Sequence, residues 1–155
     1  MSTRAIIITH LPGQPYRSIY SHSDGYPDWL GRALRAYFND PAKAAALIDL
    51  GDISGIADDG SVSAYYRDRG EPWHEVQPAE FSTMTETLDY CDQFDRFYLL
   101  DITDDFPGWQ YCRRQNDNTV AWQPLDHVID TLESPDFADR FPPYLRLLPS
   151  PSPHT

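Results

Sequence analysis

The stretch FYLLDI, residues 97–102, is the strongest indication of the fold in this chain. It is a short run of mostly apolar and aromatic residues, followed by turn-forming residues at 104–108, and this pattern is typical of a buried strand. The stretch WQYCR, residues 109–113, comes directly after that turn. Two such runs on either side of a turn with Pro and Gly predict a β-hairpin.

A second hairpin is expected near the N-terminus. The β-branched run RAIIIT, residues 4–9, is followed by a Pro-Gly turn and by the alternating sequence RSIYS, residues 17–21. Residues 62–66 and 120–122 predict two further short strands. The Gly- and Asp-rich segment 52–61 indicates a loop between elements.

Helical segments separate these strands. Apolar residues recur at helical spacing over 29–38 and again over 41–50. Asp40 precedes the second of these segments as its expected N-cap, with a proline at the first helical position. Residues 82–93 and 124–132 predict two more helices.

Together these elements predict a single α+β domain over residues 1–145, in which an antiparallel sheet of hairpins packs against three to four helices. A chain of 155 residues with 14% aromatic residues has enough apolar area for one buried core. Residues 146–155 are rich in Pro and Ser and predict a flexible tail. The sequence shows neither an apolar run of about 20 residues nor a signal peptide, so we expect a cytoplasmic protein without membrane contact.

Acidic residues are concentrated in the second half of the chain. The net charge is -12, and residues 75–140 carry fifteen acidic and four basic residues. This balance argues against direct binding of nucleic acid. The acidic half is either a solvated surface or a surface that binds a protein partner with a basic surface, as a nucleic-acid mimic does. In the second case we expect two contact clusters: Asp101, Asp104 and Asp105, and Asp126, Asp130 and Glu133.

The segment YSHSDGYP, residues 20–27, combines titratable side chains with a turn. In one interpretation His22 and Asp24 form a binding or acid–base pair, with Tyr26 beside them. In the other, Asp24 makes the turn and helps to cap the following helix, while His22 bonds to the backbone. The residue types fit both interpretations.

A second charged segment, YRDRGE at 66–71, contains two arginines that an extended strand would place on one side. Two arginines on one face are able to bind a phosphate or a carboxylate. Alternatively they connect the two halves of the protein through ion pairs with Asp24, Asp52 or Glu71. We then expect the segments 19–27, 50–54 and 66–71 to meet in space, with Arg67 or Arg69 paired to Asp24 or Asp52.

No metal or cofactor is predicted. The five histidines lack H-x-x-x-H and H-E-x-x-H spacing, and the chain has only two cysteines, Cys91 and Cys112. Both are expected to lie in the core as small apolar residues.

Three sequence blocks follow one another in the chain: IYSHSDGYP at 19–27, LGDIS at 50–54 and YRDRGE at 66–71. Their order resembles a family of small proteins of bacteriophages and prophages. The family pattern has Cys and Trp at the positions of Ser21 and Ser23. No activity comes with the resemblance, which implies a genomic setting only. The matching residues are Tyr20, His22, Asp24, Gly25, Tyr26, Pro27, Gly31, Leu50, Gly51, Asp52, Ser54, Arg67, Asp68, Arg69, Gly70 and Glu71.

Two functions are expected from these features. The first is a phage or prophage accessory protein in the cytoplasm of the bacterial host, which inhibits a defence or nucleic-acid-handling complex without catalysis, as anti-CRISPR proteins do. The second is a nucleotide- or small-anion-binding or hydrolytic domain that uses His22, Asp24, Arg67, Arg69 and Glu71. A pocket that joins the blocks favours the second function, and a flat acidic face without a pocket favours the first.

Overall fold

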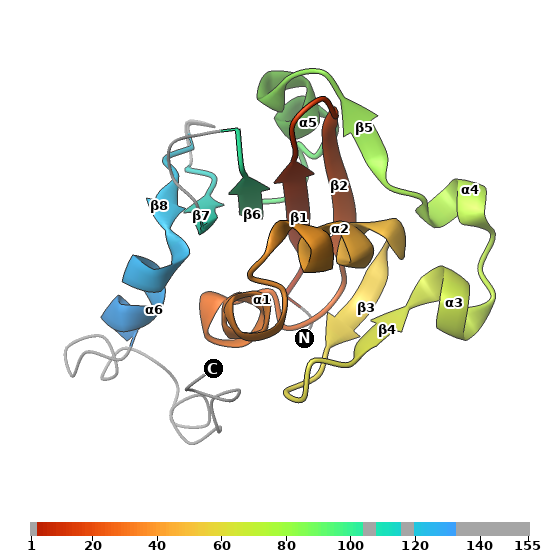
Figure 1. Cartoon of the computed structure of the whole chain (residues 1–155), viewed down its shortest axis with the longest axis horizontal. Helices are drawn as coiled ribbons and strands as arrows, with labels where there is room; N and C mark the ends of the chain where they lie inside the picture. Colours follow the sequence, from red (N-terminus) through yellow and green to blue (C-terminus); the bar gives the residue numbers. More distant parts are fainter. Residues whose placement is uncertain (1–2, 104–107, 116–119, 133–155) are drawn as a thin grey trace.

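The computed structural model describes residues 3–103, 108–115 and 120–132, which form one mixed sheet with helices on both faces (Figure 1). The strands are β1 (Ala5–His10), β2 (Tyr16–Ser21), β3 (Ile53–Ile56), β4 (Val62–Ala64), β5 (Ala79–Phe81), β6 (Arg96–Asp101), β7 (Trp109–Arg113) and β8 (Gln123–Pro124). The helices are a π-helical turn η1 (Pro27–Gly31), α1 (Arg32–Tyr37), α2 (Pro41–Asp49), α3 (Tyr65–Arg69), α4 (Trp73–Val76), α5 (Met84–Tyr90) and α6 (Leu125–Leu132). The predicted α+β class is confirmed.

The strand order is β4-β3-β2-β1-β6-β7-β8, and β5 pairs with β2. The hairpins β1–β2 and β6–β7 are antiparallel, as the sequence predicts. The pairs β1–β6 and β2–β3 are parallel, however, with Ile8 opposite Leu99 and Ser21 opposite Ile53. A parallel pair needs a long crossover connection, so local sequence patterns predict the hairpins and not the way in which they join.

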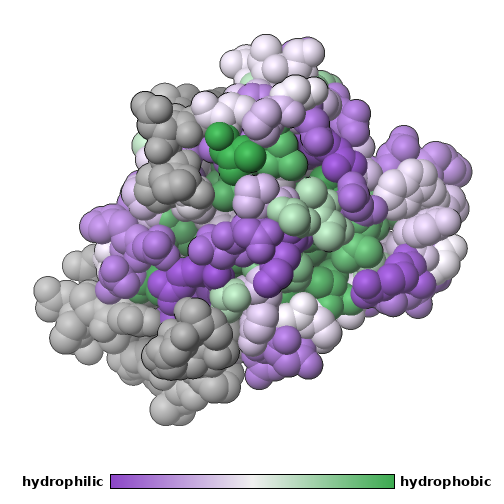
Figure 2. All heavy atoms as spheres, in the orientation of Figure 1, coloured by the Kyte–Doolittle hydropathy of each residue, from purple (hydrophilic) through white to green (hydrophobic). Residues whose placement is uncertain are grey.

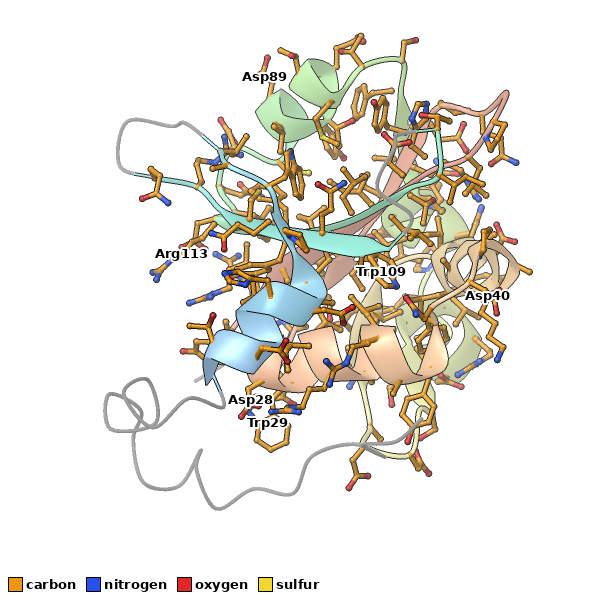
Figure 3. The ribbon with its side chains drawn as sticks, turned by 60° about the vertical axis from the view of Figure 1, so that its left-hand side comes forward. Asp28, Trp29, Asp40, Asp89, Trp109 and Arg113 are labelled. Atoms are coloured by element: carbon orange, nitrogen blue, oxygen red, sulfur yellow. The ribbon has the colours of Figure 1, made fainter. Side chains whose placement is uncertain are left out.

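Side chains of the central strands alternate between two apolar cores. Ile7 on β1 faces the core beneath α1, α2 and α6, whereas Ile6 and Ile8 face the core beside α5. Figure 3 shows α5 above the sheet, with α1 and α6 below it. In the same view Trp109 extends from β7 towards the α1 layer, where its Nε1 donates to the Phe38 carbonyl at 3.0 Å.

Two predicted elements are wrong. The segment 52–61 contains strand β3 instead of being a loop, because Ile53 is fully buried between β2 and β4. Residues 65–69 form helix α3 and not a strand. The Asp68 carboxylate accepts the Ala64 N–H at 2.7 Å at the start of this helix, and Gly70 ends it with a φ of 70°.

The remaining predictions fit to within a few residues or fall outside the described part. The predicted strand at 120–122 is displaced: these residues are not in a strand, and β8 occupies Gln123–Pro124, so the helix begins at Leu125 and not at Pro124. Cys91 and Cys112 are buried, as expected. Most of the predicted turn at 104–108 and the whole tail at 146–155 lie outside the described residues. Within the described ranges, no helix has both the length and the apolar character that crossing a membrane requires.

Candidate functional site

The three sequence blocks meet where strands β2, β3 and β4 lie side by side. Ile53 is opposite Ser21 on one side and opposite Ala64 on the other. Beyond the paired residues, the Ser23 N–H and hydroxyl both donate to the Ser54 carbonyl, at 3.0 and 2.7 Å. The expectation that the blocks meet in space is confirmed.

Asp52 is held by hydrogen bonds to three other elements. Its Oδ1 accepts the Tyr20 N–H at 2.9 Å, its carbonyl accepts the Tyr65 N–H at 3.2 Å, and its N–H donates to the Val76 carbonyl at 2.8 Å. Burial raises the pKa of Asp52 to about 6, and the charge of Glu71 adds to this effect, against the Tyr20 hydrogen bond. None of the described residues forms an ion pair with the Asp52 carboxylate.

Tyr20 provides an aromatic wall beside Asp52. Its hydroxyl shares a hydrogen bond with His22 Nδ1 at 2.5 Å, and its ring lies 5.5 Å from that of Phe94. The Arg4 guanidinium lies 5.0 Å from the centroid of the same Phe94 ring. Burial raises the pKa of Tyr20, the nearby Tyr65 adds to this, and Arg4 opposes it. The phenol is therefore neutral near pH 7.

A pocket of about 610 Å³ opens beside these residues, between the sheet and the segment 74–94. Its ionisable side chains include two carboxylates, one guanidinium and the imidazole of His74, whose Nε2 lies 3.9 Å from Glu75 Oε2. Its aromatic side chains come from β2 and from the α5 region. Besides His74, these residues are Asp52, Glu75, Arg4, Tyr20, Tyr90 and Phe94. The sequence gives no motif for the residues from segment 74–94, because they come together only when that segment folds over the sheet.

Residues of the first block are only partly directed towards this pocket. His22 is exposed and does not line the pocket, but its Nδ1 shares a hydrogen bond with the hydroxyl of the lining residue Tyr20. Asp24 is exposed, with a φ of 58°, so its backbone makes the turn. Tyr26 lies under the Arg96 guanidinium, which is 4.6 Å from its ring centroid.

Neither arginine of the third block forms the ion pair that we expected. Arg67 donates to the neighbouring Asp68 at 2.9 Å and to the Val62 carbonyl. Arg69 donates to Ser54 Oγ at 3.4 Å. The prediction of an ion pair with Asp24 or Asp52 is therefore wrong.

The helical conformation of residues 65–69 is the physical reason. Residues two positions apart on a helix do not face each other, so Arg67 and Arg69 diverge, and Arg69 lies over the Tyr65 ring at 5.0 Å. Figure 2 shows mainly hydrophilic residues over α3 and α4. The two arginines do not line the pocket, whereas Glu71 lies close enough to Asp52 to affect its pKa.

Asp101, a predicted partner-binding residue, is only 8% exposed. Its Oδ1 accepts the Thr103 N–H at 2.9 Å and the Thr103 hydroxyl at 2.6 Å, and it lies 3.1 Å from His10 Nδ1. The parallel pairing of β1 with β6 brings His10 and Asp101 together across 91 residues. Local sequence patterns contain no signal for this contact.

The other predicted partner-binding acids are exposed or lie outside the described residues. Asp126 and Asp130 are exposed on α6, and Asp126 is 3.5 Å from Arg35. Asp104, Asp105 and Glu133 lie outside the described residues.

Within the described ranges, no three His, Cys, Asp or Glu side chains gather in a way that would hold a metal ion. Comparisons of the chain with protein-family models, with curated proteins and with solved structures gave no match. The resemblance to phage and prophage proteins therefore stays a prediction, and the function has to be inferred from the geometry of the site.

Proposed function

We propose that this protein is a binding protein whose ligand occupies the pocket between β2 and the α5 region. One observation carries the proposal: the first two sequence blocks each contribute a side chain to the lining of one pocket, and a residue of the third block lies close to it. The first block supplies Tyr20 and the second supplies Asp52, while Glu71 of the third lies close to Asp52. A concave site with aromatic walls and a few polar groups, one of them with a perturbed pKa, is the usual form of a ligand site.

The size and composition of the pocket fit a small molecule or a single large side chain. A volume of about 610 Å³ lies within the usual range for ligand pockets, about 300–1,000 Å³. Tyr20, Tyr90 and Phe94 offer apolar contact. Asp52 is fixed by its hydrogen bond to the Tyr20 backbone, so it is already oriented before a ligand binds.

A pocket-filling variant tests this proposal. Gln93 is exposed and lines the pocket, so Gln93→Trp would fill it, whereas Gln14→Trp adds the same side chain in the turn between β1 and β2. We expect small aromatic probes, screened by NMR, to shift the ring signals of Tyr20 and Phe94 in the wild-type protein and in Gln14→Trp. Gln93→Trp should abolish these shifts. Probes of every charge class leaving those signals unmoved would refute the proposal.

A second candidate function is favoured by the acidic surface. Segment 75–95 contains six carboxylates and no Lys, Arg or His. Glu80 pairs with Arg17, whereas Asp89 and Asp92 are exposed and form no ion pair with any described residue. Figure 3 shows Asp89 extending from α5 away from the sheet. This surface supports the alternative proposal of an accessory protein that binds a basic surface of a host protein complex.

Matched charge reversals test the second candidate. The double variant Asp89→Lys/Asp92→Lys alters the α5 surface. Asp126→Lys/Asp130→Lys changes the net charge equally on α6, where the sequence predicts a contact cluster, so the pair of variants shows which of the two surfaces the partner contacts. A partner isolated from host cells should associate more slowly with the α5 variant, and its association with the wild-type protein should slow as salt is added. Equal association rates for the α5 variant and the wild-type protein would refute this candidate.

A further inference from the structure

We infer that the pocket takes a positively charged group, an ammonium or a guanidinium, and that the Asp52 carboxylate pairs with it. This inference rests on the proposed function, because it assigns a ligand class to the same pocket. It departs from the nucleotide or small anion that the sequence predicted.

The charges around Asp52 favour a cation. Asp52 and Glu75 both line the pocket, and Glu71 lies close to Asp52. His74 also lines the pocket, and its Nε2 lies 3.9 Å from Glu75, not beside Asp52. The one guanidinium of the lining, Arg4, lies against Phe94 and the Tyr20 hydroxyl. Arg4 therefore does not pair with Asp52, and the Asp52 carboxylate has no counter-charge among the described residues. An anion placed beside Asp52 would be repelled by these carboxylates.

The Asp52 carboxylate also has unused capacity to accept hydrogen bonds. Two carboxylate oxygens offer about four acceptor positions, and the described residues occupy one of them, through the Tyr20 N–H. Ammonium and guanidinium groups carry several N–H donors. Such a ligand would supply both the missing donors and the missing charge, which offsets the cost of keeping the carboxylate partly buried.

The aromatic walls are also suited to a cation. The Arg4 guanidinium already lies 5.0 Å from the centroid of the Phe94 ring, at a distance typical of cation–π contacts. This wall of the pocket therefore accepts a guanidinium within the protein itself. Tyr20 and Tyr90 also line the pocket, so a cation that comes from a ligand would meet further aromatic surface there.

Three probes of one shape and different charge test the inference: benzylammonium, benzyl alcohol and benzoate. We expect benzylammonium to bind at least tenfold more tightly than benzoate in NMR titrations at pH 7.5. Asp52→Asn should weaken benzylammonium about tenfold, because it removes the counter-charge and keeps an oxygen for the Tyr20 N–H. Asp58→Asn, the same change at an exposed position outside the pocket, should leave the affinity unchanged.

The outcomes separate this inference from the proposed function. Tighter binding of benzoate, or unchanged benzylammonium affinity in a folded Asp52→Asn protein, would overturn the cation inference and leave a ligand pocket in place. No binding by any of the three probes would overturn both. Should Asp52→Asn fail to fold, the carboxyl ¹³C signal of Asp52 in the wild-type protein reports the pairing directly, and a signal that benzylammonium leaves unmoved would overturn the inference. Glu75→Gln, at the exposed side of the pocket, then tests the general preference for a cation, with a smaller expected loss of about threefold.

A comparison of two peptides identifies the source of the cation. A blocked Gly-Arg-Gly tripeptide and its citrulline counterpart differ in the charge of one side chain. Tighter binding of the arginine peptide than of benzylammonium would indicate a basic side chain of a protein partner, and the reverse order would indicate a free amine. Equal binding of the arginine and citrulline peptides would contradict the inference.

Discussion

The Asp52 side chain accepts the backbone N–H of Tyr20 at 2.9 Å, across 32 residues of sequence. This contact joins the second sequence block to the first and fixes a carboxylate in the wall of the pocket. The Asp52 N–H donates in turn to the Val76 carbonyl, at the end of α4. One residue thus connects strand β2 to the segment beside the pocket. Because its carboxylate is also partly buried in the pocket wall, the charge of Asp52 should affect both binding and stability.

Replacing Asp52 by Asn should stabilise the protein above pH 6. The folded state raises the pKa of Asp52 from 3.8 to about 6, so ionisation of this group destabilises the fold. This penalty is absent below about pH 4 and fully present above about pH 6. The shift corresponds to about 3 kcal/mol, and because solvent screens this partly exposed carboxylate we expect Asp52→Asn to increase the free energy of unfolding at pH 8 by only about 2 kcal/mol. Urea denaturation from pH 4 to pH 8 measures this, and a difference that does not change with pH would contradict it.

Two serines of the first block should respond in opposite directions to the same substitution. Ser21 is fully buried, and its hydroxyl has no hydrogen-bond partner among the described residues. Ser23 donates to the Ser54 carbonyl at 2.7 Å. Ser21→Ala should therefore raise the free energy of unfolding by about 1 kcal/mol, and Ser23→Ala should lower it by about 1 kcal/mol. Thermal denaturation of the two variants checks the signs, and a clear loss of stability in Ser21→Ala would count against this account.

Gly51 should tolerate alanine much less well than Gly13. Both have a positive φ, 79° and 74°, which costs a residue with a Cβ about 1 kcal/mol. A Cβ at Gly51 would also lie 2.5 Å from the Val76 carbonyl oxygen, whereas Gly13 has open space. We expect Gly51→Ala to lose roughly 3 kcal/mol in urea denaturation, because backbone atoms must shift. Similar losses for both variants would show that the contact with α4 is unimportant.

Local signals in the sequence predicted several elements correctly. Asp40 caps α2 by accepting the Lys43 N–H at 2.8 Å, and Thr83 caps α5 by accepting the Glu86 N–H. Such caps and the two hairpins depend on residues that are close in the chain. The charge alternation of residues 66–71 predicts a strand, because it resembles the two-residue period of a strand. The helix α3 that forms instead depends on backbone contacts: Asp68 accepts the Ala64 N–H, and Gly70 ends the helix.

The candidate site depends on contacts between distant segments, which sequence patterns do not encode. The order of the blocks indicated that Tyr20 and Asp52 belong together, but nothing marked Arg4 or Phe94 as their neighbours. The contact of His10 with Asp101 likewise requires the parallel pairing of β1 with β6. These residues become neighbours only through the order of strands in the sheet.

Asp101 should act on stability and not on partner binding. Its carboxylate is buried and accepts bonds from Thr103 and His10. Asp101→Asn should reduce the free energy of unfolding by about 2 kcal/mol, because the amide replaces a charge-assisted acceptor. Asp130→Asn, on the exposed side of α6, should change it by less than about 0.5 kcal/mol. Equal effects of the two variants on urea denaturation would contradict this assignment.

The pKa of Asp52 in the presence and absence of a cation tests the central claim most directly. The carboxyl ¹³C signal of Asp52 is followed by NMR from pH 3 to pH 9, in the free protein and with saturating benzylammonium. We expect a pKa of about 6 in the free protein, and a value at least one unit lower when the cation pairs with the carboxylate. A pKa near 4 in the free protein, or a raised pKa that benzylammonium leaves unchanged, would contradict the account of an uncompensated carboxylate in a ligand pocket.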